Sequence, residues 1–297
     1  MNLKIVPDVI NGQTFVMINY AQTARKGAEF MKKHDIGAVL VSRTDYSTKG
    51  ILTDRDITRR LVADGLDPDK TFLEEIMTAA PMVVAPKSRV RNVLKLMREG
   101  NFRHMPVVDD NAAYGIVSVR DIYSAMLQRL QGASEKQRAK AIMQTSILPR
   151  VIDGQHLIHL PPSATVCEAA SLMQHHSIGA VLVMKGEKLK GIFTERDVNF
   201  QVVAAGLSPD TTPLSKVRTK DLVTVNLDDG CEDVLQKMEA RNCQHMPVFD
   251  GDRLVGVVSM RDIDNFLQIH IERRFGVSPI QRVLEPVMRR FGNNSRR

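Results

Sequence analysis

The chain has 297 residues, of which 43% are hydrophobic and 25% charged, and its formal net charge is +7. This composition is typical of a soluble globular protein with enough apolar material for two domains. No apolar run approaches the roughly 18 residues that span a bilayer, so no membrane span is expected. The opening residues contain no hydrophobic signal region and the three cysteines form no CxxC pair. Both features favour the cytoplasm over secretion.

The same order of predicted elements occurs four times along the chain: a short apolar strand, a helix, two β-rich runs and a second helix. The first strand is predicted at 16–18. In the later repeats, apolar residues recur at i, i+3, i+4 and i+7 from Val90, from Val166 and from Cys231. That spacing predicts one buried stripe on each of these helices. A unit of about 60 residues has little core of its own, so the repeats are expected to pair.

A heptapeptide pattern, Gly-apolar-apolar-Thr/Ser-x-Arg-Asp, follows the β-rich runs of every repeat. The four copies are GILTDRD (50–56), GIVSVRD (115–121), GIFTERD (191–197) and GVVSMRD (256–262). Their spacing of 65, 76 and 65 residues indicates that a pair of repeats has been duplicated. The predicted boundaries are 1–130 for the first pair (repeats 1–66 and 67–130), 131–148 for a helical linker, 149–270 for the second pair (repeats 149–208 and 209–270) and 271–297 for a tail.

The motif has two physical interpretations, which Thr53 and Asp56 illustrate. Thr53 stands at the expected N-cap of a helix with Asp56 at its third position, which is the pattern of a capping box. A binding site is the alternative, because a helix N-terminus suits phosphate and a carboxylate can accept both hydrogen bonds of a ribose diol. Arg55 occupies a first turn that disfavours cations. Its recurrence in all four copies indicates an anionic partner, either a ligand or a neighbouring carboxylate.

Together with the strands IGAVLV (36–41) and HMPV (104–107), the fourfold motif resembles cystathionine-beta-synthase (CBS) domains, which pair into Bateman modules. The resemblance covers roughly residues 1–270. It implies an α/β protein of the α+β type, with four β-α-β-β-α repeats paired into two pseudo-twofold modules. It further implies a regulatory sensor: such clefts hold AMP, ADP, ATP, NAD(H) or S-adenosylmethionine, and occupancy is transmitted to a partner. No catalytic cofactor is implied.

The resemblance also assigns site residues by their place in the motif. The aspartates would hold ribose, the Thr or Ser and the adjacent arginines would lie near phosphate, and the strand openings would line the base. The residues so implied are Thr53, Arg55, Asp56, Ser118, Arg120, Asp121, Thr194, Arg196, Asp197, Ser259, Arg261, Asp262, Ile36, Gly37, Ala38, Ile178, Gly179, Ala180, Arg103, His104, Met105, Pro106, His245, Met246 and Pro247. Arg103 and His104 resemble a basic pair that points at phosphates. Gln244 replaces that arginine in the second pair, which favours tighter binding in the first.

Other functions remain open at this point. The chain could be a structural or dimerisation protein whose clefts hold nothing. Seven arginines against one glutamate within 273–297 predict a basic amphipathic tail. Its expected role is docking on this chain or a sister chain, and an effector, a membrane surface or nucleic acid is the alternative. Nucleic acid is disfavoured as a general partner, because the rest of the chain is near neutral and only 5% of residues are aromatic. A homodimer formed through discs of repeats and an unknown effector protein are the expected partners.

Catalysis and metal binding are not expected. No nucleophile with an adjacent base is visible in the motifs. His175-His176 and His156-x-x-His159 have no accompanying carboxylate or cysteine at suitable spacing for a metal site. His34 and His176 are interpreted as residues at helix ends, where a cation is favourable.

Overall fold

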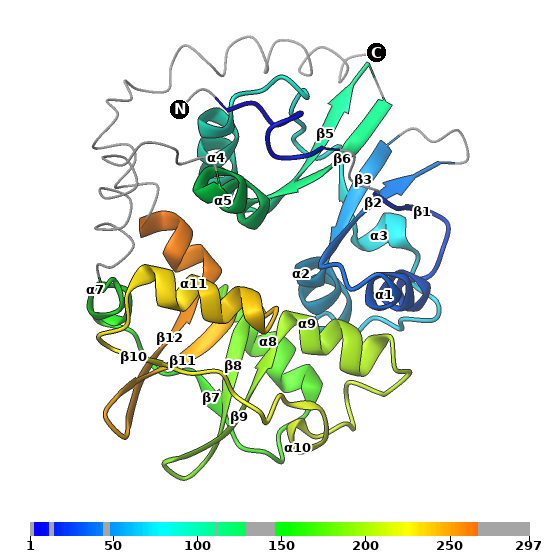
Figure 1. The fold of residues 1–297 in the computed structure, drawn as a ribbon. Coiled ribbons are helices and arrows are strands. Elements are labelled where there is room, and N and C mark those ends of the chain that lie inside the picture. Colours follow the sequence, from blue (N-terminus) through cyan, green and yellow to red (C-terminus); the bar gives the residue numbers. More distant parts are fainter. Residues whose placement is uncertain (1–2, 12–14, 44–47, 111, 129–145, 267–297) are drawn as a thin grey trace, which may run out of the picture.

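The computed structural model describes residues 3–11, 15–43, 48–110, 112–128 and 146–266. The predicted tail 271–297 and most of the predicted linker lie outside the described residues. Four α+β repeats surround the middle of the molecule (Figure 1), and the predicted fold class is confirmed. We number the repeats 1 to 4 in chain order, after the four motif copies.

Repeats 1 and 3 are built alike. In each sheet the first strand pairs in parallel with the second, and the second strand pairs antiparallel with the third. A short fourth strand extends the sheet of repeat 1. The elements of repeat 1 are β1 (Met17–Asn19), α1 (Ala24–Lys33), β2 (Ala38–Ser42), β3 (Thr48–Thr53), α2 (Asp54–Asp56), η1 (Ile57–Val62), α3 (Leu73–Ile76) and β4 (Thr78–Ala79). Those of repeat 3 are β7 (His159–Leu160), α8 (Val166–His176), β8 (Ala180–Lys185), β9 (Lys188–Thr194), α9 (Glu195–Asp197), η2 (Val198–Val203) and α10 (Leu214–Val217).

Repeats 2 and 4 form the second matched set. Repeat 4 has a three-stranded sheet, whereas in repeat 2 a single parallel bridge from Val84 to Val107 stands where the first strand is expected. The elements of repeat 2 are α4 (Val90–Glu99), β5 (His104–Asp109), β6 (Ala112–Ser118) and α5 (Val119–Gln128). Those of repeat 4 are β10 (Val225–Asn226), α11 (Cys231–Ala240), β11 (His245–Asp250) and β12 (Arg253–Ser259). A further helix, α7 (Leu148–Ile152), precedes repeat 3 in the chain.

The predicted apolar stripes are confirmed on α4, α8 and α11. Each helix begins at the residue where its pattern begins, and the stripe faces the core. The buried residues are Val90, Val93, Leu94 and Met97 on α4, Val166, Ala169, Ala170 and Met173 on α8, and Cys231, Val234 and Met238 on α11. The periodicity of the sequence is therefore enough to orient these three helices.

The second helix of repeats 1 and 3 differs from the regular helix that the sequence predicts. After three α-helical residues the chain continues into the π-helical segments η1 and η2, in which the N–H of Ala63 donates to the carbonyl of Thr58 at 2.9 Å. A side-chain bond from the Thr58 hydroxyl to the carbonyl of Asp54, at 2.9 Å, accompanies the change. Short π-helical turns are frequent at functional sites.

Two hydrophobic cores hold the repeats together, and each core combines both halves of the chain. One joins repeats 1 and 3, where α1 contacts η2 and α8 contacts η1. The other joins repeats 2 and 4 and includes Met97, Ile122 and Met238. Strands β2 and β6 connect repeats 1 and 2. Because one cleft is lined by both repeats 3 and 4, the order around the molecule is 1–2–4–3 (Figure 1).

The segment that precedes each pair of repeats packs on the second repeat of that pair. Leu3, Ile5 and Ile10 are buried in the core of repeats 2 and 4, although they precede repeat 1 in the chain. The N–H of Ile5 donates to the carbonyl of Ser88 at 2.9 Å. In the second half, α7 contacts β12 in the equivalent way.

Candidate functional site

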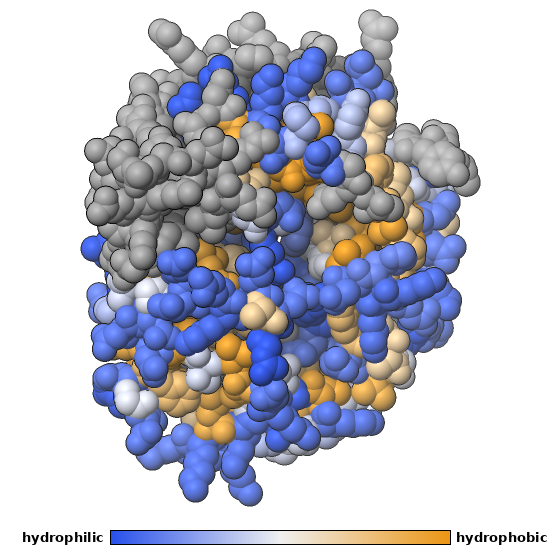
Figure 2. Space-filling view, viewed as in Figure 1, coloured by the Kyte–Doolittle hydropathy of each residue, from blue (hydrophilic) through white to orange (hydrophobic). Residues whose placement is uncertain are grey.

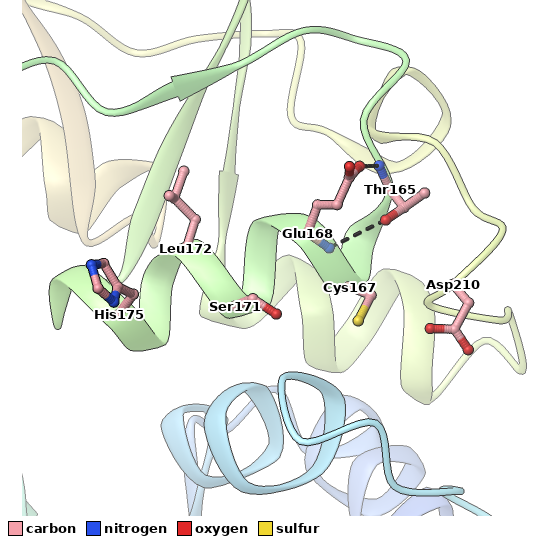
Figure 3. A pocket seen from close by; sticks show the side chains of 7 residues that line it. All are labelled: Thr165, Cys167, Glu168, Ser171, Leu172, His175 and Asp210. Atoms are coloured by element: carbon pink, nitrogen blue, oxygen red, sulfur yellow. Dashed lines mark hydrogen bonds between the residues drawn. The ribbon is translucent and has the colours of Figure 1, made fainter.

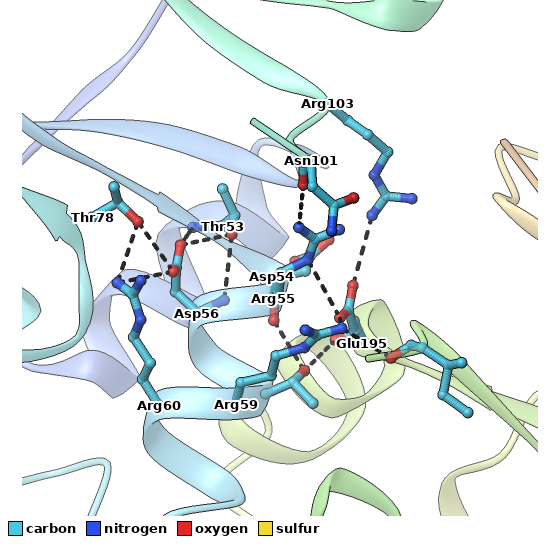
Figure 4. A network of polar contacts seen from close by, with 12 residues as sticks. Thr53, Asp54, Arg55, Asp56, Arg59, Arg60, Thr78, Asn101, Arg103 and Glu195 are labelled. Carbon is cyan, nitrogen blue, oxygen red and sulfur yellow. Dashed lines mark hydrogen bonds and ion pairs between the residues drawn. The ribbon is translucent and has the colours of Figure 1, made fainter. Parts of the chain in front are cut away.

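In all four motif copies the aspartate accepts from the Thr or Ser at the cap, and in repeats 1 to 3 the reciprocal bond completes a capping box. In repeat 1 the Asp56 Oδ2 accepts from the Thr53 N–H at 2.9 Å and from the Thr53 hydroxyl at 2.7 Å (Figure 4). Asp121, Asp197 and Asp262 accept in the same way from Ser118, Thr194 and Ser259, at 2.6–2.9 Å. The cap interpretation of the motif is therefore correct in each repeat. The cap uses Oδ2 of each aspartate and leaves Oδ1 for other partners.

The second carboxylate oxygen distinguishes the repeats. Asp56 Oδ1 pairs with Arg60 at 3.2 Å and lies 3.4 Å from the Thr78 hydroxyl. Asp197 Oδ1 accepts from the Thr219 hydroxyl at 3.2 Å. Burial raises the pKa of Asp56 and of Asp197, and the bonds from their capping residues oppose that rise. In repeat 1 Oδ1 is thus already paired with a cation, while in repeat 3 it accepts from a hydroxyl.

Three of the four motif arginines bind the loop that follows the first helix of a different repeat. Arg196 donates to the Asp35 carboxylate at 2.5 Å, and Arg55 donates to the Asn101 carbonyl at 2.8 Å. Arg120 donates to the Asn242 side chain at 2.9 Å. Asp35, Asn101 and Asn242 all adopt a left-handed backbone conformation, with φ of 46 to 54°. Of these three bonds only that of Arg196 goes to a carboxylate, which is one of the two possibilities that the sequence left open; the oxygens that Arg55 and Arg120 bind are neutral.

A charged cluster occupies the place where the motif helices meet (Figure 4). Glu195 is 3% exposed, and its carboxylate lies 3.3 Å from Arg59, 3.6 Å from Arg103 and 3.8 Å from Arg55. Burial lowers the pKa of Arg59 and of Arg103. It also lowers the pKa of Arg261 to about 10, with repulsion from Arg55 and Arg103 as a further cause. The cluster therefore gathers more cations than anions in a weakly solvated place.

A cleft of about 220 Å³ runs from this cluster outward between repeats 3 and 4. Figure 2 shows a molecular face that is mostly hydrophilic and hollowed near its middle. The cleft contains motif residues of repeat 3 and the start of β11. Its lining residues are Asp54, Arg103, Ile192, Thr194, Glu195, Arg196, Asp197, Thr219, Asp221, Leu222, Val223, Arg241, Asn242, Cys243, Gln244, His245 and Pro247.

A family model for the CBS domain matches residues 10–63, 73–128, 139–202 and 214–268. This chain belongs to the CBS domain family. The four matches follow the four repeats, so the predicted resemblance is confirmed.

Curated relatives share this domain at moderate identity. The CBS domain-containing protein CBSCBSPB3 of Arabidopsis thaliana is 26% identical over 249 residues, which is 75% of this chain and 45% of that protein. YhcV of Bacillus subtilis, also a CBS domain-containing protein, is 37% identical over 102 residues, 34% of this chain and 72% of its own length. The chain spans about half the length of the first Arabidopsis relatives that it matches.

Solved structures share the fold. Protein MJ1225 from Methanocaldococcus jannaschii, proposed as an archaeal homologue of g-AMPK, superposes with a TM-score of 0.71 at 16% identity, covering 89% of this chain and 100% of that chain. An uncharacterized conserved protein from Pyrococcus horikoshii has a TM-score of 0.51 at 19% identity and covers 86% and 95%. The first likeness extends over nearly the whole chain, so all four CBS repeats have counterparts in one known arrangement.

Arg103 links the two CBS pairs. Sequence reasoning placed it at the phosphates of the first pair and regarded Gln244 as a loss in the second. In the structure Arg103 itself lines the cleft between repeats 3 and 4, together with Gln244. The cation that the fourth CBS repeat lacks is thus supplied from the second, and the described cleft lies in the second pair.

The two predicted histidines are half-buried near Arg103. Burial lowers the pKa of His104 and of His245 to about 3, with repulsion from Arg103 among the further causes. Both are therefore neutral near pH 7 and can contact a ligand only as neutral hydrogen-bonding groups. The His245 ring lies so close to Gly179 that a Cβ added there would be 2.9 Å from it.

The predicted base-lining residues fall into two groups. Gly37 and Gly179 lie beside the motif helices, because their carbonyls accept from the N–H groups of Asp54 and Glu195 at 3.1 and 3.0 Å. Their neighbours Ile36, Ala38, Ile178 and Ala180 flank these positions. Met105 and Met246 are instead buried in the core of repeats 2 and 4. Pro247 lines the cleft, whereas Pro106 is buried in β5.

Sequence reasoning missed Asp54, Arg59, Glu195 and the loop residues Thr219 and Asp221. One signal was available: the residue after the motif Thr or Ser is acidic in repeats 1 and 3 but apolar in repeats 2 and 4. Thr219 carries a second signal, because it stands where repeat 1 has Thr78 and both hydroxyls contact the motif aspartate. Asp221 has no such counterpart, so only the fold brings it to the cleft.

A second depression is lined by residues of α8 and holds none of the motif residues (Figure 3). It includes Thr165 and Glu168, which form an ordinary capping box with a 2.6 Å bond from the Thr165 N–H. Cys167 lies there as well, and burial raises the pKa of its thiol.

No helix in the described part of the chain is long and apolar enough to cross a membrane. The described residues also contain no group of three or more metal-ligating side chains.

Proposed function

We propose that this CBS-domain protein is a regulatory sensor that binds an adenosine-type nucleotide, AMP, ADP, ATP or NAD(H), in the cleft between repeats 3 and 4. One observation carries the proposal: the motif residues Thr194 and Asp197 line the same cleft as Arg103. A ribose acceptor and a phosphate-binding cation thus face the same space.

The chemistry of the lining supports this ligand class. Asp197 can accept from a ribose hydroxyl through Oδ1 while Oδ2 keeps its cap, if the Thr219 hydroxyl turns aside. Ile192, Leu222 and Val223 offer apolar surface for a base. The volume of about 220 Å³ is below the roughly 300–1,000 Å³ of many ligand sites. A nucleotide would therefore fill the cleft and extend through its mouth.

Occupancy would be transmitted through the arginine contacts that connect the repeats. Arg196 lines the cleft and also holds Asp35 of repeat 1. A ligand that displaces Arg196 would therefore loosen the contact between repeats 1 and 3. The name given to MJ1225, an archaeal homologue of g-AMPK, agrees with a regulatory role. A cytoplasmic location, a homodimer and an effector protein that reads occupancy belong to the same proposal, and an enzymatic role does not.

The test is thermal unfolding and calorimetric titration with AMP, ADP, ATP and NAD(H). A ligand at 100 times its Kd should stabilise the protein by about 2.7 kcal/mol. Asp197→Asn should weaken that ligand at least tenfold, because a carboxamide offers one acceptor instead of two. Asp262→Asn is the matched control, since it alters the same cap in repeat 4 outside the cleft lining.

Two results would contradict the proposal. If nucleotide-free protein is stabilised by none of the four ligands, the structural or dimerisation role becomes the better account. If Asp262→Asn abolishes binding and Asp197→Asn does not, a nucleotide binds, but at a different pair of motif residues.

A further inference from the structure

Glu195 has an unusual position for a glutamate. It follows the motif threonine, where repeats 2 and 4 have Val119 and Met260. Its side chain is only 4% exposed, yet no hydrogen bond from a described residue reaches its Oε1. Its neighbours are cations at 3.3–3.8 Å. A buried carboxylate is stable in such a place only because these cations offset its desolvation.

The cations around Glu195 come from other repeats. Arg55 and Arg59 belong to repeat 1 and Arg103 to repeat 2, and the electrostatic influence of Arg261 brings in repeat 4. The Nε atoms of Arg55 and Arg59 are buried without a hydrogen-bond partner among the described residues. Asp54, the other acidic residue nearby, is bonded to Asn199 at 2.6 Å. Glu195 is therefore the main counter-ion of the cluster.

The same carboxylate lines the cleft. Arg103 and Glu195 both line it, and they face each other at 3.6 Å. A phosphate that enters this part of the cleft would compete with Glu195 for Arg103. Every additional negative charge on the ligand would then be repelled by the carboxylate that already holds the arginines.

We propose that Glu195 determines which ligand charge the cleft prefers. Its carboxylate neutralises part of the charge of the arginine cluster. The cleft therefore prefers adenosine ligands of low negative charge, a monophosphate or a dinucleotide, over a triphosphate. This inference rests on the proposed function and adds to it the class of ligand. Asp54, Asp197 and Asp221 also line the cleft, and their acidic side chains act in the same direction.

The decisive variant is Glu195→Gln, which keeps the shape of the side chain and removes its charge. We expect the ratio of ATP affinity to AMP affinity, measured by calorimetry, to rise at least tenfold. Inorganic tripolyphosphate should raise the Tm of the variant clearly more than that of the wild type. Glu187→Gln is the control, because Glu187 is exposed in the β8–β9 turn and its loss changes the net charge equally. That control should leave the affinity ratio unchanged.

The outcomes separate this inference from the proposed function. An unchanged ratio in Glu195→Gln, with AMP still bound, overturns the inference and leaves the function standing. No nucleotide binding by wild type or variant overturns both. If the variant unfolds because its arginines lack a counter-ion, tripolyphosphate should restore the folded state by replacing the carboxylate. Failure of that rescue also overturns the inference.

Discussion

Asp35 and Asn242 touch although 207 residues separate them: the Asn242 amide donates to the Asp35 carboxylate at 2.9 Å. Asp35 also accepts from Arg196, and Asn242 accepts from Arg120. These four side chains come from four different CBS repeats. A short chain of polar contacts therefore connects all four repeats, and the Asp35–Asn242 bond joins repeats 1 and 4, which are not neighbours in the order 1–2–4–3.

Removing the charge of Asp35 from this series of polar contacts should have a small effect on the stability of the protein. The Asp35 side chain is 68% exposed, and exposed ion pairs contribute about 0–1 kcal/mol. Asp35→Asn should therefore lower the free energy of unfolding by no more than about 1 kcal/mol, because Asn also tolerates the left-handed backbone. Chemical denaturation measures this. A loss of several kcal/mol would mean that the contact with Arg196 is much less solvated than its exposure indicates.

Gly179→Ala should damage the cleft directly. The new Cβ would lie 2.9 Å from the His245 ring and 3.2 Å from Glu195 Oε2, so one of these two side chains must shift, and both line the cleft. We expect a destabilisation of about 1–3 kcal/mol together with weaker nucleotide binding in calorimetry. Gly27→Ala is the comparison, since its Cβ would meet Leu73 at 2.7 Å, away from the cleft. It should lose stability and keep its affinity, and equal losses of affinity would refute the steric explanation.

The pH dependence of stability should show two opposing contributions. The pKa of His104 and of His245 is about 3 in the folded protein, below the ordinary value of 6.5. Their contribution is complete above about pH 6.5 and is lost as the pH falls toward 3, at about 1.4 kcal/mol per pH unit for each. Burial raises the pKa of Asp54 to about 7. Its contribution is complete below about pH 4 and is lost as the pH rises toward 7.

Variants separate these two contributions. Asp54→Asn should make the loss of stability between pH 6.5 and pH 5 steeper, because only the histidine contribution then acts. His104→Gln with His245→Gln should reverse the slope in the same range. Urea unfolding at four pH values is sufficient to measure it. A slope that stays the same in both variants would show that neither group titrates in this way.

Met173→Ala should destabilise the whole chain in a single transition. Met173 is fully buried in the core that repeats 1 and 3 share, and truncation of a buried Met typically costs about 2–5 kcal/mol. Because each core combines both halves, we expect one calorimetric unfolding peak at a lower Tm. Two separated peaks, only one of them shifted, would indicate that the halves unfold independently.

Local features of this fold were predictable from the sequence, and long-range ones were not. The capping boxes follow from Thr53 and Asp56 three residues apart, and the stripe from Val90 to Met97 orients α4, because both depend on neighbours within one or two turns. The partners of the motif arginines lie 46 to 161 residues away. The burial of Glu195 depends on three arginines at once, of which only Arg55 belongs to the motif. The periodicity of the sequence does not predict contacts between residues so far apart in the chain.

The two shared cores pair like with like: repeat 1 with repeat 3, its copy, and repeat 2 with repeat 4, its copy. The contact of α1 with η2 is mirrored by that of α8 with η1, as at the interface of a symmetric dimer. The chain in this sense resembles a dimer whose two subunits are joined covalently, so the association of its two halves does not depend on protein concentration. Covalent joining also frees each copy from having to match the other. Arg103 and Gln244, or Asp54 and Glu195, differ where two identical subunits could not.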